Sequence, residues 1–577
     1  MLELNRIDIK DLTFTGGVVN VIEKSGRIID GVNHGRKVFH DEKNYYKIFD
    51  LDYCRRQNFI DALNAGFFDE IAPALTGLIM DGDEIIGYIM KRGRPIPQQE
   101  LASKKEFNQK IIDLVTETGM FYYDFVKQNV IKTEDKLPSI IDLESVYPIH
   151  ELYQIDRHNA VVKPDSYFKK LETIWRENLR PISFIQPSRN NLKYLKWSYK
   201  SIRKNLSPIH EICWADDFSD DGTWEWMQEI AKKDPLVKIH RNEGPNRLGH
   251  TILYDTLVDM ATNDIVMIYH ADMYACPGLD DQVLQLMKPG TVVSATRIEP
   301  PLHPDGPEKI LLDCGIEPEE FDEDKLLTYL NTTDTGAKPT KGIFAPWAIY
   351  KKDFQAINGH DPLYAPQSKE DSDIFNRFVL AGYDLVQTWK GFVYHMTSRG
   401  SRFKDGAVRN PDGQVFMKNR ESDEWLKQNQ RSTRNFIRKW GHFVKHDPMM
   451  YPIIPPKYDI GFVVKDCDYK HMVDLEPWCS TLYSEYTGVI ESYITHEQPN
   501  TMFDLSERLK HEYHSEFTND VIVKFNAKQL NQNNFQVLMN LSEMLHDSGE
   551  VGEMEYDIFK FEIKSLKTYE KDLIIRK

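Results

Sequence analysis

Short apolar runs alternate with amphipathic stretches in the middle of the chain. The runs are PISFIQPS (181–188), HEICWADD (210–217) and DIVMIYHAD (264–272), and each is apolar enough to predict a buried strand. Strands separated by helical segments pair in parallel within an α/β sheet. Ligands on such a sheet bind beyond the carboxyl ends of its strands, so we expect the chemistry in the turns that follow these runs.

The alternation continues on both sides of this region. Before it, the strand-like segments NYYKIFD (44–50) and EIIGYIM (84–90) lie among helical patterns. After it, PIIPP (452–456) breaks any helix and is suited to a linker. Beyond the linker, the pattern predicts strands at DIGFVV (459–464) and NDVIVKF (519–525), and helices at LEPWCSTLYSEY (475–486) and QVLMNLSEMLHD (536–547).

The length of the chain predicts several domains. Its 577 residues exceed the ~250–300 residues that one hydrophobic core usually organises. We therefore predict an N-terminal module at 1–165, a central α/β domain at 180–450 and a smaller C-terminal α/β domain of unknown role at 457–577.

Composition is that of a globular protein, with 41% hydrophobic and 28% charged residues. The opening MLELNRIDIK lacks the basic-then-apolar order of a secretory signal, and no apolar run approaches the ~18 residues that span a bilayer. We therefore expect a cytoplasmic protein without a transmembrane segment. The cysteines form no CxxC pair, which favours free thiols over a zinc cluster. They are Cys54, Cys213, Cys276, Cys314, Cys467 and Cys479.

The net charge of -17 conceals one basic stretch. Between Arg399 and Lys445 there are 12 Lys and Arg residues against 5 Asp and Glu residues. Local charge, not the total, sets the field at a binding surface. Two interpretations stay open, a solvated helix face and a site for a phosphate-bearing ligand.

Three motifs in the central region carry a resemblance. The first strand ends in the turn Pro187-Ser188-Arg189-Asn190, the second in EICWADDFSDDGT, and the third in His270-Ala271-Asp272. In this order, they resemble the family 2 glycosyltransferases of the GT-A fold, over roughly residues 180–450. The resemblance implies a Rossmann-like domain that binds a nucleotide sugar. The donor-binding residues that it implies are Pro187, Ser188, Arg189, Asp216, Asp217 and Asp272.

The resemblance also implies a metal site. Asp272 takes the place of the carboxylate that holds the cation, whereas His270 stands where the family keeps its first acid. Imidazole can ligate manganese, so the departure leaves a site for Mn²⁺ or Mg²⁺ in place. His395, at the end of GFVYH, matches a histidine that completes such sites. Arg399 and Arg402 are expected to pair with the diphosphate, because guanidinium groups bind phosphate oxygens in two-point geometry.

The acceptor side is carried by two further segments, GIFAPWAIYKKDFQAINGHDPLY (342–364) and KEDSDIFNRFVLAGYDL (369–385). They resemble the family's Gly-x-Asp turn and the Glu-Asp pair that opens a helix. Asp371 takes the place of the catalytic base, with Glu370 beside it. Repulsion between the two carboxylates raises a pKa and the helix dipole lowers it, so the sequence leaves the balance open.

The N-terminal module resembles the protein-kinase-like α+β fold. Lys47 lies on a predicted strand, EIIGYIMKRGRPI is similar to the strand and hinge, and Asp124, Asn129 and Asp142 stand near catalytic and metal-binding positions. The Gly-rich loop is missing, the histidine before Asp124 is a tyrosine, and most of the helical lobe is absent. We expect a degenerate module for packing or acceptor binding. An active phosphotransferase and a chance match stay open.

The sequence therefore predicts a metal-dependent, inverting glycosyltransferase. Its donor would be a nucleoside-diphosphate sugar, with UDP favoured, and its acceptor a hydroxyl of a glycan or lipid-linked sugar. One alternative is transfer to hydroxylated bases in phage DNA, motivated by the basic stretch. Others are a bifunctional protein with an active N-terminal phosphotransferase and a sugar-binding scaffold without activity. The sequence specifies neither the sugar nor the oligomeric state.

Overall fold

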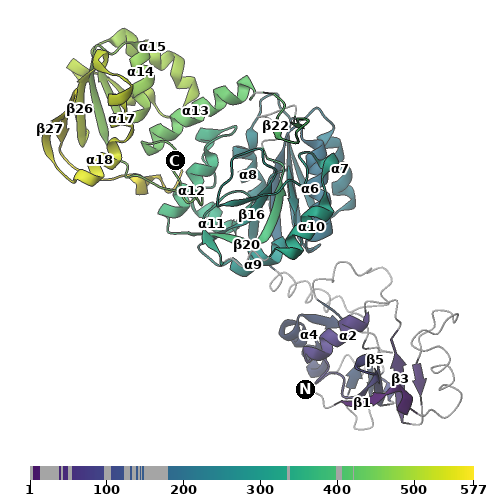
Figure 1. Ribbon diagram of the computed structural model, residues 1–577. Coiled ribbons are helices and arrows are strands. Elements are labelled where there is room, and N and C mark those ends of the chain that lie inside the picture. Colours follow the sequence, from purple (N-terminus) through teal and green to yellow (C-terminus); the bar gives the residue numbers. More distant parts are fainter. Residues whose placement is uncertain are drawn as a thin grey trace. The chain divides into compact units, whose positions relative to one another are not determined.

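The computed structural model divides the chain into two compact units, Met1–Arg180 and Pro181–Lys577 (Figure 1). The described residues of the first unit are 4–12, 38–40, 43–49, 55–91, 93–96, 105–122, 130–132, 138–140, 143, 146–148 and 180. Those of the second unit are 181–333, 338–397, 406–419 and 421–576. The finer division into three domains stays a prediction.

A five-stranded sheet with the order β1-β4-β5-β3-β2 organises the first unit. β1 runs parallel to β4, and the other neighbours are antiparallel. The strands are β1 (Asn5–Asp8), β2 (Val38–His40), β3 (Asn44–Ile48), β4 (Leu75–Asp81) and β5 (Glu84–Lys91). The other described elements are η1 (Ile9–Asp11), α2 (Arg55–Asn64), β6 (Arg94–Pro95), α4 (Lys105–Thr118), β7 (Met120–Tyr122), β8 (Val130–Lys132), β9 (Pro138–Ile140) and β10 (Val146–Pro148).

The two strands predicted in this unit are confirmed as β3 and β5. Lys47 lies on β3 and is buried. The remaining residues of the kinase-like pattern lie outside the described residues, namely Tyr123, Asp124, Asn129 and Asp142. The resemblance of this unit to a protein kinase therefore stays a prediction.

A ten-stranded sheet forms the centre of the second unit. Its main path runs β13-β12-β11-β14-β19-β16-β20-β15, with β17 beside β16 and β18 beside β20. The predicted buried runs are confirmed as β11 (Ile182–Ser188), β12 (Glu211–Asp217) and β14 (Ile265–Ile268). The other strands are β13 (Val237–Asn242), β15 (Met273–Ala275), β16 (Thr291–Glu299), β17 (Lys309–Leu311), β18 (Thr340–Lys341), β19 (Trp347–Tyr350) and β20 (Asp384–His395).

Strand direction gathers distant residues at one edge of this sheet. β13, β12, β11, β14, β16 and β20 all run the same way, because β19 pairs antiparallel with both β14 and β16. Their carboxyl ends therefore meet at one edge, as parallel pairing requires. β15 starts beside the end of β20, with Met273 opposite His395. Asp272 and His395 are thus neighbours although they lie far apart in the sequence.

Helices cover both faces of the sheet (Figure 1). They are α6 (Leu192–Asn205), α7 (Thr223–Lys233), α8 (Gly249–Met260), α9 (Leu279–Leu286), α10 (Glu323–Thr332), α11 (Lys351–Ala356) and α12 (Glu370–Leu380). α8 packs against β11 and β12, and α12 packs against β20. The core between them includes the fully buried Trp214 and Trp347. A small hairpin of β21 (Ala407–Arg409) and β22 (Val415–Met417) follows.

A six-stranded sheet with the order β25-β24-β23-β26-β28-β27 lies in the C-terminal part. Its strands are β23 (Ile460–Lys465), β24 (Thr481–Ser484), β25 (Leu509–His511), β26 (Val521–Asn526), β27 (Gly552–Tyr556) and β28 (Phe559–Ile563). Its helices are α14 (Tyr469–Leu475), α15 (Thr487–Glu497), α16 (Leu505–Arg508), α17 (Gln532–Met539) and α18 (Leu541–Ser548). In the order of the sheet, β25, β24, β23 and β26 run parallel to one another. β28 is antiparallel to both of its neighbours, β26 and β27.

One predicted helix in this part is wrong. Leu475, the first residue of LEPWCSTLYSEY, ends α14. The 3-10 turn Glu476–Trp478 and the strand β24 follow it. Pro477 has no backbone N–H and so cannot extend α14, whereas Thr481 and Tyr483 favour a strand that pairs with β23. In short apolar runs of this kind, periodicity alone does not distinguish a helix from a strand.

The long helix α13 (Asp423–Trp440) joins the two sheets through buried charges. On one side, Lys439 Nζ lies 2.6 Å from Asp361 and 2.7 Å from Asp373 of α12. On the other, Arg438 lies 2.8 Å from Glu476, and both side chains are fully buried. α13 therefore links the first turn of α12 to the C-terminal part of the chain.

None of the described helices combines the length and apolar character needed to cross a bilayer. The cysteines among the described residues are free and buried, as expected for thiols. Cys54 lies outside the described residues.

Candidate functional site

A cavity of about 1220 Å³ lies at the carboxyl edge of the ten-stranded sheet. Strand ends, the start of α8 and the start of α12 line it. The predicted residues that line it are Pro187, Ser188, Arg189, Asp217, His270, Asp272, Glu370, Asp371 and His395. Asp216 does not line it, and Arg399 and Arg402 lie outside the described residues.

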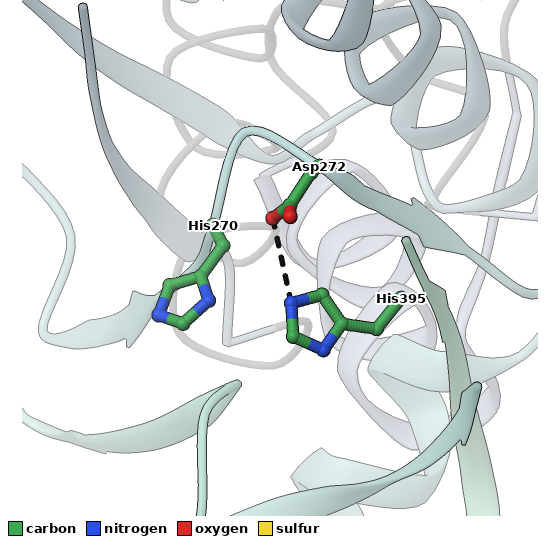
Figure 2. Close-up of side chains that lie close together, drawn as sticks. All are labelled: His270, Asp272 and His395. Carbon is green, nitrogen blue, oxygen red and sulfur yellow. Dashed lines mark ion pairs between the residues drawn. The ribbon is translucent and has the colours of Figure 1, made fainter. Parts of the chain in front are cut away.

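His270, Asp272 and His395 form a compact cluster in this cavity (Figure 2). His395 Nε2 lies 3.4 Å from Asp272 Oδ1, and the ring centroids of the two histidines are 5.6 Å apart. One ligand atom from each residue lies within 4.8 Å of the others. Two imidazoles and one carboxylate at this spacing could hold a divalent metal ion.

The two histidines differ in charge. Burial lowers the pKa of His270 to about 4, with a further contribution from the charge on His395. His270 is therefore neutral near pH 7, the form in which imidazole binds a metal. Burial lowers the pKa of His395 too, but Asp272 and Glu299 outweigh burial and raise it to about 9. A metal must displace that proton before His395 can ligate it.

The acid pair at the start of α12 lines the same cavity. Ser368 and Lys369, just before it, have φ values of 80° and 73°, a left-handed backbone that costs side-chain-bearing residues energy. His250 Nε2 lies 2.7 Å from Glu370 Oε1. Burial raises the pKa of Glu370, but the charge of His250 and its hydrogen bond outweigh burial. The pKa of Glu370 is therefore below its usual value, and the carboxylate is ionised.

Asp371 behaves differently from its neighbour. Burial and the negative charge of Glu370 raise its pKa to about 6. Burial, which the sequence does not reveal, therefore adds to the repulsion from Glu370, and the two together raise this pKa. A carboxylate with this pKa is ionised near pH 7 and basic enough to accept a proton from a hydroxyl.

The two acids expected on the donor side have different surroundings. Asp217 accepts hydrogen bonds from Asn242 Nδ2 (2.8 Å), Leu248 N (3.0 Å) and Gly249 N (2.8 Å). It therefore holds the start of α8 in addition to lining the cavity. Asp216 is fully buried, its pKa is raised by burial, and its Oδ1 has no hydrogen-bond partner.

Further polar atoms at the first strand end are buried without a partner. They are Ser188 Oγ and Arg189 Nε, and both residues line the cavity. Buried polar atoms are usually hydrogen-bonded, so both atoms could hydrogen-bond to a bound ligand. Backbone packing is close where α8 begins, because a Cβ on Gly249 would lie 1.9 Å from Pro366 O.

Among the cavity residues that sequence reasoning missed are Glu299 and His250. Glu299 ends β16 and its Oε1 lies 3.0 Å from His395 Nδ1. Its signal in the sequence is the acid that closes the apolar run TVVSATRIE (291–299), just as Asp217 closes an earlier run. His250 opens α8 and carries no such signal, since only the fold brings it to Glu370.

Five of the eight described Lys and Arg residues of the basic stretch pair with carboxylates elsewhere in the chain. Arg409 pairs with Asp313, Arg434 with Glu497, and Lys445 with Glu543. Arg438 and Lys439 are buried in the ion pairs of α13. Lys418 and Lys427 are exposed. Internal pairing therefore reduces the positive charge that motivated a nucleic-acid acceptor.

Comparison with known proteins gives one family match. Residues 183–336 match the model "Glycosyl transferase family 2". No curated protein sequence matches the chain.

Three solved structures are similar to parts of the chain. GalNAc-T7 with UDP, GalNAc and Mn²⁺ has 15% identity and a TM-score of 0.33, over 46% of this chain and 49% of that one. The mannosyltransferase PcManGT from Pyrobaculum calidifontis with GDP-Man and Mn²⁺ has 18% identity and a TM-score of 0.28, over 38% and 58%. S. aureus TarS 1–349 with UDP has 16% identity and a TM-score of 0.27, over 37% and 60%. The chain thus spans 49% to 60% of their lengths.

Proposed function

We propose that this chain, a glycosyltransferase by the family match over residues 183–336, transfers a sugar from a nucleoside-diphosphate donor to a hydroxyl acceptor. One observation carries the proposal. The cluster of His270, Asp272 and His395 and the acid pair of Glu370 and Asp371 line the same cavity. Glycosyl transfer needs both, because charge grows on the diphosphate while the acceptor hydroxyl loses a proton.

The metal site would be formed by His270, Asp272 and His395. When bound, a divalent cation neutralises the charge that develops on the diphosphate leaving group. The donor set fits Mn²⁺ better than Mg²⁺, because Mg²⁺ prefers oxygen ligands whereas imidazole suits transition metals. The neutral state of His270 supports this assignment.

The nucleotide would bind at the ends of β11 and β12. Ser188 Oγ and Arg189 Nε are buried polar atoms of the cavity wall, and nucleoside hydroxyls, base edges or phosphates can hydrogen-bond to them. Asp217, which also lines the cavity, is the acid of the β12 turn that can reach the donor. Asp216 does not line the cavity, so its predicted donor contact would need a rearrangement. UDP is favoured by the resemblance of the acidic turn after β12. Arg399 and Arg402 remain proposed contacts of the diphosphate.

Asp371 would act as the general base. Its carboxylate accepts the proton of the acceptor hydroxyl, whose oxygen then attacks the anomeric carbon from the face opposite the diphosphate. We assign Asp371 as the base and no residue as a nucleophile for a second displacement, so the proposed transfer inverts the configuration in one step. Glu370, held by His250, keeps Asp371 basic through its negative charge.

The acceptor is proposed to be a glycan or a lipid-linked sugar. Transfer to duplex DNA is less favoured, because five of the eight described cations of the basic stretch pair with carboxylates of the chain itself. A sugar-binding scaffold without activity is less favoured too, since His270 retains the neutral imidazole that a metal needs.

Donor turnover tests the proposal. The protein is incubated with a panel of UDP- and GDP-sugars and Mn²⁺, and release of the nucleoside diphosphate is measured. We expect turnover of one donor, with loss in Asp371→Asn while binding of that donor persists. No turnover of any donor with or without acceptor glycans, or full turnover by Asp371→Asn, would contradict it.

A further inference from the structure

The buried carboxylate of Glu299 stands directly behind His395. Glu299 is 1% exposed, and its Oε1 lies 3.0 Å from His395 Nδ1. The other ring nitrogen, Nε2, lies 3.4 Å from Asp272 Oδ1. The imidazole is therefore held between two carboxylates, with Nε2 toward Asp272 and Nδ1 toward Glu299.

Two cations fix Glu299 in this place. Arg297 Nη1 lies 2.9 Å from Oε1, and Lys309 Nζ lies 3.2 Å from Oε2. The guanidinium of Arg297 is itself held, with its carbon 3.8 Å from the ring centroid of Phe344 and Nη2 3.3 Å from Glu308. Both oxygens of Glu299 thus have partners, and the carboxylate cannot rotate away from His395 without losing an ion pair.

We propose that Glu299 is a positioning residue of the metal site, which accepts the Nδ1–H of His395 and so presents Nε2 to the metal. A neutral imidazole carries one proton, and the hydrogen bond of one nitrogen decides which nitrogen is free to ligate. A carboxylate behind a ligating histidine also makes the ring a stronger donor. Glu299 acts through His395 and is not itself a ligand. The inference rests on the proposed function, because it requires a metal at His270, Asp272 and His395.

A purely structural role for Glu299 would be the neutralisation of Arg297 and Lys309. The two roles separate by substitution. Glu299→Asp retains the charge that the two cations need, but its side chain is one methylene shorter and cannot keep the bond to His395. Glu299→Gln retains the length and removes the charge. Glu308→Gln is the matched control, because Glu308 binds Arg297 and has no contact with His395.

The test is a titration of the full chain with Mn²⁺. The electron paramagnetic resonance signal of free Mn²⁺ measures how much of the metal is bound. We expect about 10- to 100-fold weaker Mn²⁺ binding in Glu299→Gln and Glu299→Asp, the range typical of lost partners behind metal ligands. Glu308→Gln should bind Mn²⁺ as the wild type does. Melting temperatures without metal show whether each variant folds, and Glu299→Asp decides the question if Glu299→Gln does not fold.

Each outcome bears on one claim. Wild-type affinity in Glu299→Asp, or an equal loss in Glu308→Gln, would overturn the positioning role and leave the proposed function intact. A wild-type protein that binds no Mn²⁺ would instead contradict the metal site of the proposed function. Loss of Mn²⁺ binding in both Glu299 variants, with retention in Glu308→Gln, is the result that the geometry requires.

Discussion

The acid limb of the pH–rate profile is predicted to report Asp371. Burial and the charge of Glu370 raise the pKa of this carboxyl to about 6 from a usual value of 3.8. A base works only when deprotonated, so activity should be nearly full above this pKa and fall as the pH decreases through it. With a pKa of about 6, roughly 90% of the base is ionised at pH 7 and roughly 10% at pH 5. The rate should therefore fall about tenfold between these two values.

The assay is release of the nucleoside diphosphate at Mn²⁺ concentrations where further metal has no effect. Saturation matters because Mn²⁺ must displace the proton of His395, so loss of metal would mimic loss of the base. Asp371→Asn should reduce turnover about 10²- to 10⁴-fold, the usual contribution of a general base. That range corresponds to roughly 3–5 kcal/mol of transition-state stabilisation.

Glu370→Gln tests the electrostatic cause. Burial is the larger contribution to the raised pKa of Asp371 and would persist, whereas the repulsion from Glu370 would vanish. The midpoint of the acid limb should therefore move below 6 without reaching the usual value. A limb that stays in place in Glu370→Gln, or that survives in the residual activity of Asp371→Asn, would refute the assignment of this limb to Asp371.

Three further outcomes are expected. Glu476→Gln should cost about 3–5 kcal/mol in guanidinium unfolding, because it removes the buried charge that pairs with both Arg438 and Arg508, whereas Glu229→Gln at an exposed pair should leave the midpoint unchanged. Gly249→Ala should lower the melting temperature more than Gly278→Ala, because a Cβ at 249 meets Pro366 O and one at 278 meets nothing within 4 Å, and equal effects would contradict this packing. Fluorescence anisotropy with duplex DNA should show no binding that weakens steeply between about 50 and 200 mM salt, since five of the eight described cations of the basic stretch pair with carboxylates of the chain.

Much of the central fold could be predicted from local patterns. The three apolar runs became β11, β12 and β14, because a strand buried on both faces needs continuous apolar sequence. The position of Asp272 after such a run predicted its place at the sheet edge, and the cavity indeed includes it. The helix start at Glu370 followed from the Glu-Asp pair.

Other features depend on tertiary contacts that a sequence pattern does not contain. The pairing of His250 with Glu370 joins residues from α8 and α12, and the bond of Glu299 to His395 joins β16 and β20. The basic stretch predicts a cationic binding surface only because its acidic partners, such as Glu476 and Asp361, lie elsewhere in the sequence. The strand β24 was mistaken for a helix because its apolar run is short.

The central claim is that one cavity binds a nucleotide sugar through a metal held by His270, Asp272 and His395. The most direct test is the melting temperature of the protein with its donor, with and without Mn²⁺, in the wild type and in Asp272→Asn. A ligand at one hundred times its dissociation constant stabilises the folded state by about 2.7 kcal/mol. The account predicts that the donor raises the wild-type melting temperature strongly only with Mn²⁺, and that Asp272→Asn loses this increment. An equal rise without Mn²⁺, or in Asp272→Asn with Mn²⁺, would contradict it.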